Sequence, residues 1–248
     1  MSASFSVTVL IPARDESEAL RPLLEALRSH ETVSPDVLVV DNGSTDGTAE
    51  IARAGGARVV PEKRRGYGSA CLRGLAALSA REPPPHVVVF MDADDACAPG
   101  QLERLVTPIR EGRADLVIGE RRSAGRRGVR WHAALGNRCI SLVLRGLYGS
   151  RTRDMGPFRA IRWHCLRDLA LDDRNYGWYV QMHVRALRLR CRITGVPVEF
   201  ERRTRGRSKV SGSFSASAAA GWVMLRTLFR EVVRAPPERA AYTSPRAP

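Results

Sequence analysis

The chain has 248 residues, 44% of them hydrophobic, which suits one large α/β domain with a substantial core. Its formal net charge of +14 favours anionic partners, but only two of its 40 basic residues are lysines, and we discount this lopsided charge as evidence for a nucleic-acid-binding protein. The five cysteines include no CxxC pair, which argues for reduced thiols in the cytosol and against a zinc site or a disulfide framework.

The sequence shows no targeting or membrane-spanning segment. Its first residues lack the basic stretch of a signal peptide and lead directly into a predicted strand. No apolar run reaches the roughly 20 residues that span a bilayer. We therefore expect a cytoplasmic protein that is soluble or peripheral at the inner face of the membrane.

Strands and helices alternate through the first half of the chain. Short apolar runs predict the strands, and apolar residues at helical spacing predict the helices between them. The expected strands are 7–11, 37–40, 57–60, 86–92 and 115–119, and the expected helices are 16–29, 48–53, 68–80 and 99–110. This alternation indicates βαβ units and a mainly parallel sheet.

The second half is less regular. An Arg/Gly-rich loop at 120–130 leads into a predicted helix, and two further helices flank a strand that we expect to be interrupted at Gly195 and Pro197. The expected helices are 131–148, 163–169, 175–190 and 214–233, with strands just before 163 and at 191–200. A basic segment at 202–209 precedes the last helix, and the proline- and alanine-rich end predicts disorder.

A valine-rich strand runs directly into two carboxylates, Asp92 and Asp94. Because this strand reads as buried on both faces, its carboxyl end should open on the crevice where α/β sheets bind ligands. Asp92 and Asp94 flank one small residue, and such a pair can hold a hard cation against a substrate phosphate. An aspartate-rich turn that caps the next helix is the alternative.

Two phosphate-binding motifs are excluded. The segment from Gly66 to Cys71 nearly matches GxGxxG but ends in cysteine and follows the third strand, and no GxxxxGK[ST] occurs anywhere. Gly66 and Gly68 are better explained as positions where the backbone approaches a ligand or a neighbouring strand.

Five motifs, taken in order, resemble the family 2 glycosyltransferases of GT-A fold. Within that family the chain looks most like the dolichyl- or polyprenyl-phosphate sugar synthases and their soluble bacterial relatives. The resemblance covers about residues 5–232, and the motifs are 11–16 (IPARDE), 40–48 (VDNGSTDGT), 91–94 (MDAD), 154–159 (DMGPFR) and 206–212 (GRSKVSG).

The resemblance implies a single α/β domain of GT-A fold over residues 1–233. Its mainly parallel, Rossmann-like sheet would be flanked by helices. Residues 5–119 would form the nucleotide-sugar-binding half, 120–212 the acceptor side with a basic lid, and 213–233 an amphipathic helix, followed by a disordered tail at 234–248.

The resemblance also implies roles for individual residues. The donor side would consist of the nucleotide-sugar-binding residues Pro12, Ala13, Arg14, Glu16, Asp41, Asn42, Asp92, Ala93, Arg203 and Lys209. Asp92 and Asp94 would hold Mg²⁺ or Mn²⁺. Arg121 would lie near the acceptor, and Asp154 close to the reacting centre.

The chain departs from the family pattern at several positions. Asn42 stands where the second member of an Asp-Asp pair is common, which affects the base preference. Ala96, after Asp95, replaces a polar residue that often follows the metal motif. Gln181 stands where relatives often carry glutamate, and Leu135 where an acceptor-side arginine is expected, with Arg138 as a possible substitute.

These features predict a metal-dependent inverting glycosyltransferase with a nucleotide-diphosphate sugar as donor. A polyprenyl phosphate is the favoured acceptor because it is already ionised and needs no base, whereas a hydroxyl would need one, with Asp154 or Asp173 as candidates. A nucleotidyltransferase would show a glycine-rich loop with lysine near the N-terminus, and 11–20 has none. A nucleic-acid-binding protein would interleave aromatic residues in its basic runs, and 120–130 contains none.

The last predicted helix has an apolar face and a basic one. Phe214, Ala218, Trp222, Leu225 and Phe229 share one face, and Arg226, Arg230 and Arg234 line another. This pattern predicts either attachment to an anionic membrane surface or packing on the protein's own core.

Overall fold

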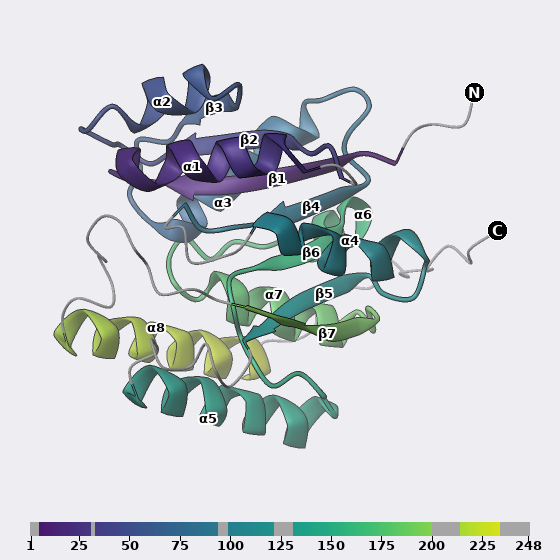
Figure 1. Ribbon diagram of the computed structural model, residues 1–248. Coiled ribbons are helices and arrows are strands. Elements are labelled where there is room, and N and C mark those ends of the chain that lie inside the picture. Colours follow the sequence, from purple (N-terminus) through teal and green to yellow (C-terminus); the bar gives the residue numbers. More distant parts are fainter. Residues whose placement is uncertain (1–4, 31–32, 94–98, 122–130, 200–213, 234–248) are drawn as a thin grey trace.

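The computed structural model describes residues 5–30, 33–93, 99–121, 131–199 and 214–233 (Figure 1). The elements are β1 (Val7–Ala13), α1 (Ser17–Arg28), β2 (Asp36–Asp41), α2 (Thr48–Ala54), β3 (Arg58–Pro61), α3 (Tyr67–Ser79), β4 (Val87–Phe90), η1 (Pro99–Gln101), α4 (Leu102–Arg110), β5 (Leu116–Arg121), α5 (Trp131–Tyr148), β6 (Arg159–Arg162), α6 (Trp163–Asp168), α7 (Trp178–Arg188), β7 (Ile193–Val198) and α8 (Phe214–Val233). No helix within these ranges is long and apolar enough to cross a bilayer.

Seven strands form one sheet in the order β3-β2-β1-β4-β6-β5-β7. Only β6 runs antiparallel to its neighbours, so the mainly parallel sheet predicted from the sequence is confirmed. Asp41 pairs with Ala13, and Phe90 with Leu10, so β1, β2 and β4 end at one edge of the sheet. The antiparallel β6 begins at that same edge, because its first residue, Arg159, pairs with Phe90.

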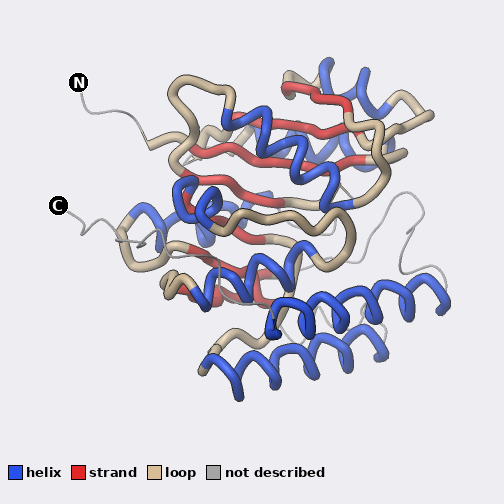
Figure 2. Tube along the Cα trace, turned by 180° about the vertical axis from the view of Figure 1, so that it is seen from behind, coloured by secondary structure: helices blue, strands red, loops and turns tan. Residues whose placement is uncertain are grey.

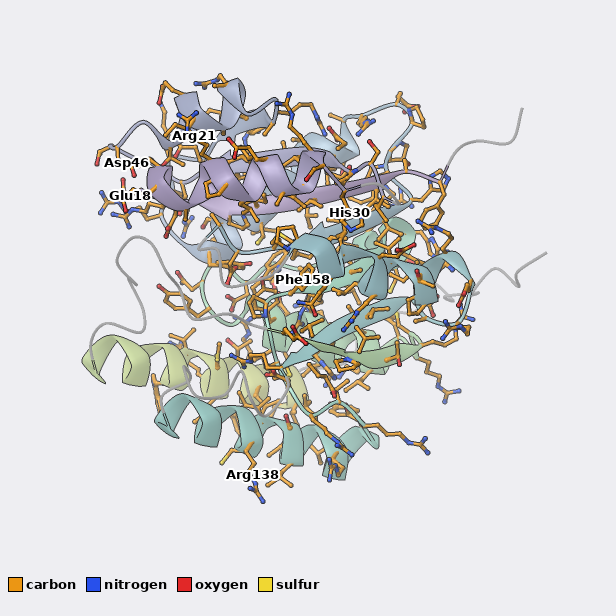
Figure 3. All side chains as sticks on the ribbon, in the orientation of Figure 1. Glu18, Arg21, His30, Asp46, Arg138 and Phe158 are labelled. Carbon is orange, nitrogen blue, oxygen red and sulfur yellow. The ribbon has the colours of Figure 1, made fainter. Side chains whose placement is uncertain are left out.

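Helices cover both faces of the sheet (Figures 1 and 2). Alternate strand residues point to opposite faces: Val9 and Ile11 of β1 pack with α1, α2 and α4, whereas Leu10 packs with α3, α6 and α7. Phe158, labelled near the centre of the molecule in Figure 3, is fully buried in the first of these layers. The strands are thus apolar on both sides, as parallel strands between two helical layers must be.

α5 and α8 lie side by side at one end of the sheet (Figures 1 and 2). Ile140 and Leu144 of α5 pack against Leu228 of α8 and against Val180 and Val184 of α7, forming a third, smaller core. α8 therefore packs on the protein through one of its sides, as one of the two sequence-based alternatives predicts.

Two strands differ from their sequence-based expectations. The sequence predicts that the 120–130 loop begins at Glu120, but Glu120 and Arg121 belong to β5 because they pair with Pro197 and Val198. The sequence also predicts an interruption of β7, yet β7 is continuous through Gly195 and Pro197. β7 lies at the edge of the sheet, where a proline is tolerated because only one side needs ladder hydrogen bonds.

Candidate active site

The predicted donor-side residues of β1 and β2 meet at the carboxyl edge of the sheet. Ala13 and Asp41 are direct partners, and the Asn42 backbone N–H donates to the Ala13 carbonyl at 2.8 Å. Pro12 and Arg14 flank Ala13 on the same strand end. Crevices at the carboxyl ends of parallel strands are where open α/β sheets bind ligands. The structure thus brings the first two motifs into one place.

Hydrogen bonds join the loops that follow β1 and β2. Asp15, in a left-handed conformation (φ 47°), accepts from the Thr45 N–H at 2.8 Å, and its own N–H donates to Ser44 Oγ at 3.0 Å. The Glu16 N–H donates to Thr48 Oγ1 at 2.9 Å. The two motifs therefore form one rigid rim, and Glu16 lies in this rim just before α1 begins.

Asp46 connects this rim to two helices. Its carboxylate accepts from the N–H groups of Ser17, at the start of α1, and of Thr48, at the start of α2, each at 3.1 Å. Figure 3 shows Asp46 beside Glu18 at that end of α1. Burial alone would raise the pKa of Asp46, but the hydrogen bonds from Thr48 and Ser17 outweigh it and lower the pKa to about 2. Asp46 is thus a charged cap for both helices.

Arg14 has a polar atom without a hydrogen-bond partner. Its Nε is buried, lies 3.6 Å from Asp15 Oδ2 and makes no hydrogen bond to a described residue. A buried donor that makes no hydrogen bond is unfavourable. This suits a position where a bound ligand supplies the acceptor.

Asn42 is buried and its amide holds the segment after β3. Its Nδ2 donates to the carbonyls of Glu62 (3.1 Å) and Arg64 (2.7 Å), and its Oδ1 accepts from the Gly66 N–H at 2.9 Å. Both amide hydrogens are therefore used inside the protein. Asn42 therefore holds this loop at the rim where the sequence predicts the nucleotide base.

Asp92 lies immediately beyond β4, next to the end of β1, because the Met91 N–H donates to the Leu10 carbonyl. Tyr67 Oη donates to Asp92 Oδ1 at 3.1 Å and also contacts the hydroxyl of Tyr179. Burial, and then the Asp92 charge, raise the pKa of Tyr67 well above its ordinary value, so its hydroxyl stays protonated. Tyr67 thereby orients the Asp92 carboxylate.

Arg159 lies fully buried beneath these residues. It donates to the Gly156 carbonyl at 2.8 and 3.0 Å, and its guanidinium lies 4.3 Å from the ring centroid of Tyr179. Burial lowers the pKa of Arg159 to about 10, so it remains charged at neutral pH. The buried cation fixes both the Tyr179 ring and the loop that carries Asp154.

Arg121 and Asp154 form a two-pronged ion pair. The Arg121 Nε and Nη2 each lie 2.6 Å from an Asp154 oxygen, and the Arg121 backbone N–H adds a third contact at 3.1 Å. The Asp154 side chain is only 6% exposed. The end of β5 and the fourth motif are thus joined, which brings together two predicted site residues 33 positions apart in sequence.

Gln181 is fully buried on α7. Its Oε1 accepts from the N–H groups of Asp172 and Asp173, both at 2.9 Å, while its Nε2 donates to Asp172 Oδ1 at 2.6 Å and to Glu231 Oε1 at 2.8 Å. Arg185 Nε donates to the same Glu231 at 2.9 Å. Gln181 therefore joins the 172–173 segment to α8.

The near-match to a dinucleotide motif at 66–71 has a packing explanation. A Cβ on Gly68 would lie 2.1 Å from the Asp173 carbonyl oxygen, and one on Gly66 would lie 2.3 Å from that of Arg174. The Ser69 N–H donates to the Arg174 carbonyl at 3.0 Å. The glycines thus allow the 173–174 segment to approach α3 closely, so the close neighbour is a loop and not the strand that the sequence suggested.

Several predicted site residues lie outside the described ranges. Asp94, Arg203 and Lys209 are among them, as are the basic segment and most of the 120–130 loop. Within the described ranges, no group of three His, Cys, Asp or Glu side chains gathers as a metal site. Asp92 is therefore the predicted metal ligand that the structure places.

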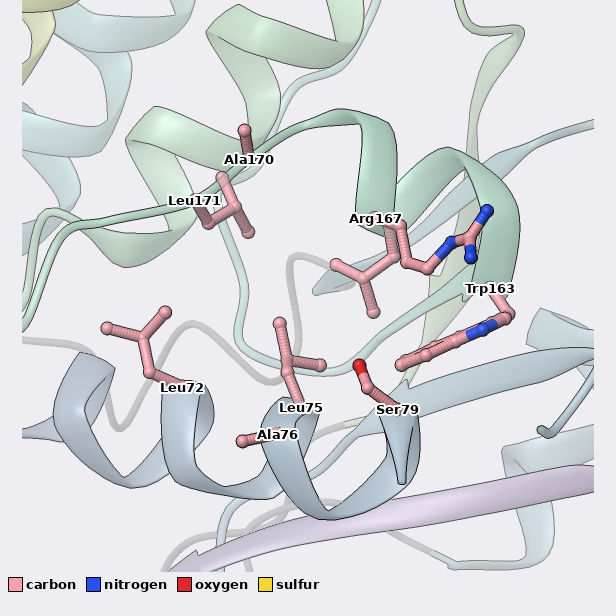
Figure 4. Close-up of a pocket in the computed structure, with 9 residues that line it drawn as sticks. Leu72, Leu75, Ala76, Ser79, Trp163, Arg167, Ala170 and Leu171 are labelled. Carbon is pink, nitrogen blue, oxygen red and sulfur yellow. The ribbon is translucent and has the colours of Figure 1, made fainter. Parts of the chain in front are cut away.

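An apolar pocket of ≈ 240 Å³ lies between α3 and α6, away from the predicted site (Figure 4). Its lining includes Leu72, Leu75, Trp163 and Leu171, with Arg167 as its charged member. The backbone N–H of Trp163 donates to the carbonyl of His86, just before β4. This part of the pocket therefore lies toward the sheet edge opposite the one that carries the predicted site. None of the predicted site residues lines it.

Comparison with known proteins agrees with this geometry. Residues 8–169 match the family described as Glycosyl transferase family 2. The chain belongs to this family. An uncharacterised glycosyltransferase of Mycobacterium tuberculosis is 38% identical over 218 residues, which cover 88% of this glycosyltransferase and 95% of the relative.

Two relatives with specific names are similar over most of their length. The undecaprenyl-phosphate mannosyltransferase of Micrococcus luteus is 36% identical, with 89% of this chain and 97% of the relative covered. The polyprenol monophosphomannose synthase of Mycolicibacterium smegmatis is 34% identical, with 83% and 81% covered.

Solved structures share the fold of this glycosyltransferase. Glucosyl-3-phosphoglycerate synthase from Mycobacterium tuberculosis, in complex with Mn²⁺, UDP and phosphoglyceric acid, gives a TM-score of 0.75 at 23% identity, over 94% of this chain and 80% of that one. Its complex with Mn²⁺, UDP-glucose and phosphoglyceric acid gives 0.72 at 24% identity, over 92% and 80%. The predicted GT-A fold is confirmed.

Three residues of this site have no role in the sequence analysis. Tyr67 follows a basic run and stands between two glycines, and Arg159 closes the fourth motif, so both carried a local signal. Tyr179 carried none, because its hydroxyl meets that of Tyr67 only through the packing of α7 against α3.

Proposed function

We propose that this glycosyltransferase moves a sugar from a nucleotide-diphosphate sugar to a polyprenyl phosphate. Two relatives similar over most of the chain are named for undecaprenyl phosphate and polyprenol, and both names specify mannose. A nucleotide-diphosphate mannose is therefore the first donor to test. A polyprenyl acceptor would also place the enzyme at the inner face of the membrane.

The engagement of the candidate bases supports a phosphate acceptor. A hydroxyl acceptor must lose a proton as it attacks, which requires a base with an available oxygen. Asp154 is held by Arg121 through both oxygens, and Asp173 accepts from the Asn175 N–H at 2.8 Å and from Thr227 Oγ1 at 3.2 Å. A phosphate is ionised at neutral pH and needs no such base. The names of the two relatives carry the acceptor assignment, and the engagement of these carboxylates agrees with it.

The donor would bind along the carboxyl edge of the sheet. We assign residues 5–119 to donor binding and 120–212 to the acceptor side. Within the first part, the rim formed by the loops after β1 and β2 would hold the nucleoside, and the unsatisfied Arg14 Nε would donate to it. Arg203 and Lys209 would add positive charge near the diphosphate, where arginine favours two-pronged contacts.

Asp92 fits a divalent cation. Its carboxylate is partly exposed at the sheet edge and is oriented by Tyr67, and carboxylate oxygens are the ligands that Mg²⁺ and Mn²⁺ take. Asp92 and Asp94, with Ala93 between them, would hold the ion. When bound, such an ion neutralises the charge that develops on the departing diphosphate.

The proposed reaction is one displacement. An oxygen of the acceptor phosphate bonds to the anomeric carbon as the bond from that carbon to the donor diphosphate breaks, and the electron pair leaves with the nucleoside diphosphate. Because the acceptor attacks opposite the leaving group, the product has the inverted configuration. NMR of the product identifies its anomer directly.

The test pairs two acceptors that differ by one phosphate. The purified protein is given Mn²⁺, a panel of nucleotide-diphosphate sugars and either a short-chain prenyl phosphate or the matching prenol. We expect glycosylated prenyl phosphate, lost with EDTA and in Asp92→Asn, and none from the prenol. Transfer to the prenol or to soluble hydroxyl acceptors, but not to prenyl phosphate, would overturn the acceptor assignment and favour the hydroxyl alternative.

A further inference from the structure

Two neighbouring helices expose apolar side chains to solvent. Among the described residues, all but one of the exposed large hydrophobic side chains belong to α5 and α8, and we call these seven residues the outer apolar face. They are Leu142, Val143 and Leu147 of α5, and Trp222, Leu225, Phe229 and Val233 of α8. Trp222 is 69% exposed and Phe229 72%, so both rings are largely in water. Groups of this kind mark a surface that has a partner.

The outer apolar face is not needed for the packing of α8. The helix packs on the protein through Thr227, Leu228 and Glu231, which are buried. Trp222, Phe229 and Val233, spaced seven and four residues apart, lie on the opposite side of the helix. The inner side thus completes the core with α5 and α7, and the outer side presents a second apolar stripe.

The exposed charges on the described parts of these two helices have one sign. The charged side chains exposed on their described parts are Arg138, Arg145, Arg226 and Arg230, and Figure 3 shows Arg138 pointing away from α5. The one carboxylate in either helix, Glu231, is 1% exposed and bonded to Arg185. A partner that matches this surface has an apolar interior beneath a negatively charged layer.

We propose that the outer apolar face docks this enzyme on an anionic lipid bilayer. Exposed aromatic and aliphatic side chains would enter the boundary between headgroups and acyl chains, and the arginines would contact lipid phosphates. This combination of apolar and cationic side chains is what interfacial helices use, and it explains why no acidic side chain is exposed on either helix.

The docking face is connected to the site through a short series of contacts. Thr227 of α8 donates to Asp173 at 3.2 Å, and the neighbouring Arg174 carbonyl accepts from the Ser69 N–H, two residues from Tyr67. Docking would hold this side of the site close to the bilayer. Its use in reaching a lipid phosphate rests on the proposed function, whereas the docking itself does not.

Vesicle co-sedimentation tests the proposal. We expect the full chain to bind vesicles of phosphatidylcholine with phosphatidylglycerol, to bind phosphatidylcholine alone much more weakly, and to release at high salt. Trp222→Ser with Phe229→Ser should lower the partition coefficient by about tenfold or more. Arg145→Glu with Arg226→Glu should lower binding to the anionic vesicles and leave binding to phosphatidylcholine vesicles unchanged. Tyr176→Ser changes the one exposed large hydrophobic side chain that the described residues have outside the two helices; it is the matched control and should bind as the wild type does.

Three outcomes would overturn the docking proposal. They are equal vesicle binding by all variants, no binding by the wild type, and concentration-dependent self-association that the Trp222 and Phe229 changes abolish, which would make a second copy the occupant. Thermal unfolding of each variant confirms that it is folded. Transfer to a short-chain prenyl phosphate in detergent reports on the site separately: a wild type that binds vesicles but glycosylates no prenyl phosphate would refute the proposed function and leave the docking intact.

Discussion

Replacing Tyr67 with phenylalanine tests whether Asp92 is held in place for a cation. The substitution removes the hydroxyl that donates to Asp92 Oδ1 at 3.1 Å and leaves the ring, which packs against Tyr179 with centroids 5.3 Å apart. Because burial and the Asp92 charge raise the pKa of Tyr67 well above its ordinary value, the wild-type hydroxyl is a donor at any assay pH near neutral. The fold should therefore survive while the carboxylate loses its orienting contact.

The expected loss follows from the strength of that contact. A hydrogen bond to a charged group contributes about 1.5–3 kcal/mol, which corresponds to roughly 10–150-fold in affinity. Losing an outer contact to a metal ligand typically lowers metal affinity about 10–100-fold. Both ranges begin at about tenfold. We therefore expect a weakening of Mn²⁺ binding by about tenfold.

Binding is measured from the EPR signal of free Mn²⁺ in the presence of a nucleoside diphosphate, alongside the Mn²⁺ dependence of sugar transfer. Tyr148→Phe removes a hydroxyl at the end of α5, where Tyr148 packs against the third core, and should change neither curve. Asp92→Asn should weaken binding more than Tyr67→Phe does. Unchanged Mn²⁺ affinity in Tyr67→Phe, with a clear loss in Asp92→Asn, would show that the tyrosine does not position the ligand.

Three further substitutions test contacts that hold the site's surroundings. Glu231→Ala leaves the Arg185 cation without its buried partner and should lower the free energy of unfolding by about 3–5 kcal/mol in urea titrations. Burial alone would raise the pKa of Glu231, but the hydrogen bonds from Arg185 and Gln181 outweigh it and hold the pKa below 4.5. The wild type should therefore lose this stability as the pH falls through and below 4.5, whereas the variant has none of it to lose. Equal acid sensitivity in the wild type and in Glu231→Ala would contradict the assignment. Asn42→Ala removes the contacts to the segment after β3 and should cost about 1–3 kcal/mol and speed tryptic cleavage at 63–65; an unchanged cleavage rate would contradict the tether. Gly68→Ala places a Cβ against a backbone carbonyl and should destabilise by about 1–3 kcal/mol, whereas Gly146→Ala, which meets open space on α5, should not; equal effects would argue against the close approach.

The order of strands and helices was predictable from the sequence because it depends on local patterns. Runs such as the valines before Asp92 can be satisfied only between two helical layers, and the alternation of strands and helices favours a parallel sheet. The motifs placed Ala13, Asp41 and Asp92 at strand ends, and the parallel arrangement then brings those ends to one edge. The end of β5 and the continuity of β7 were not predictable, because both depend on the pairing of Glu120 and Arg121 with Pro197 and Val198.

What the side chains of the site do was decided only by tertiary structure. The amide of Asn42 holds a loop, a contact that the sequence did not indicate, because the segment after β3 returns over β2 and presents carbonyls to it. The ion pair of Asp154 was not predictable either, because it forms only where the end of β5 brings Arg121 beside it. Tyr179 meets Tyr67 across 112 residues of sequence. A residue's type and its neighbours along the chain fix which bonds it can form, but the partner it bonds to depends on which distant strands and helices the core packs together.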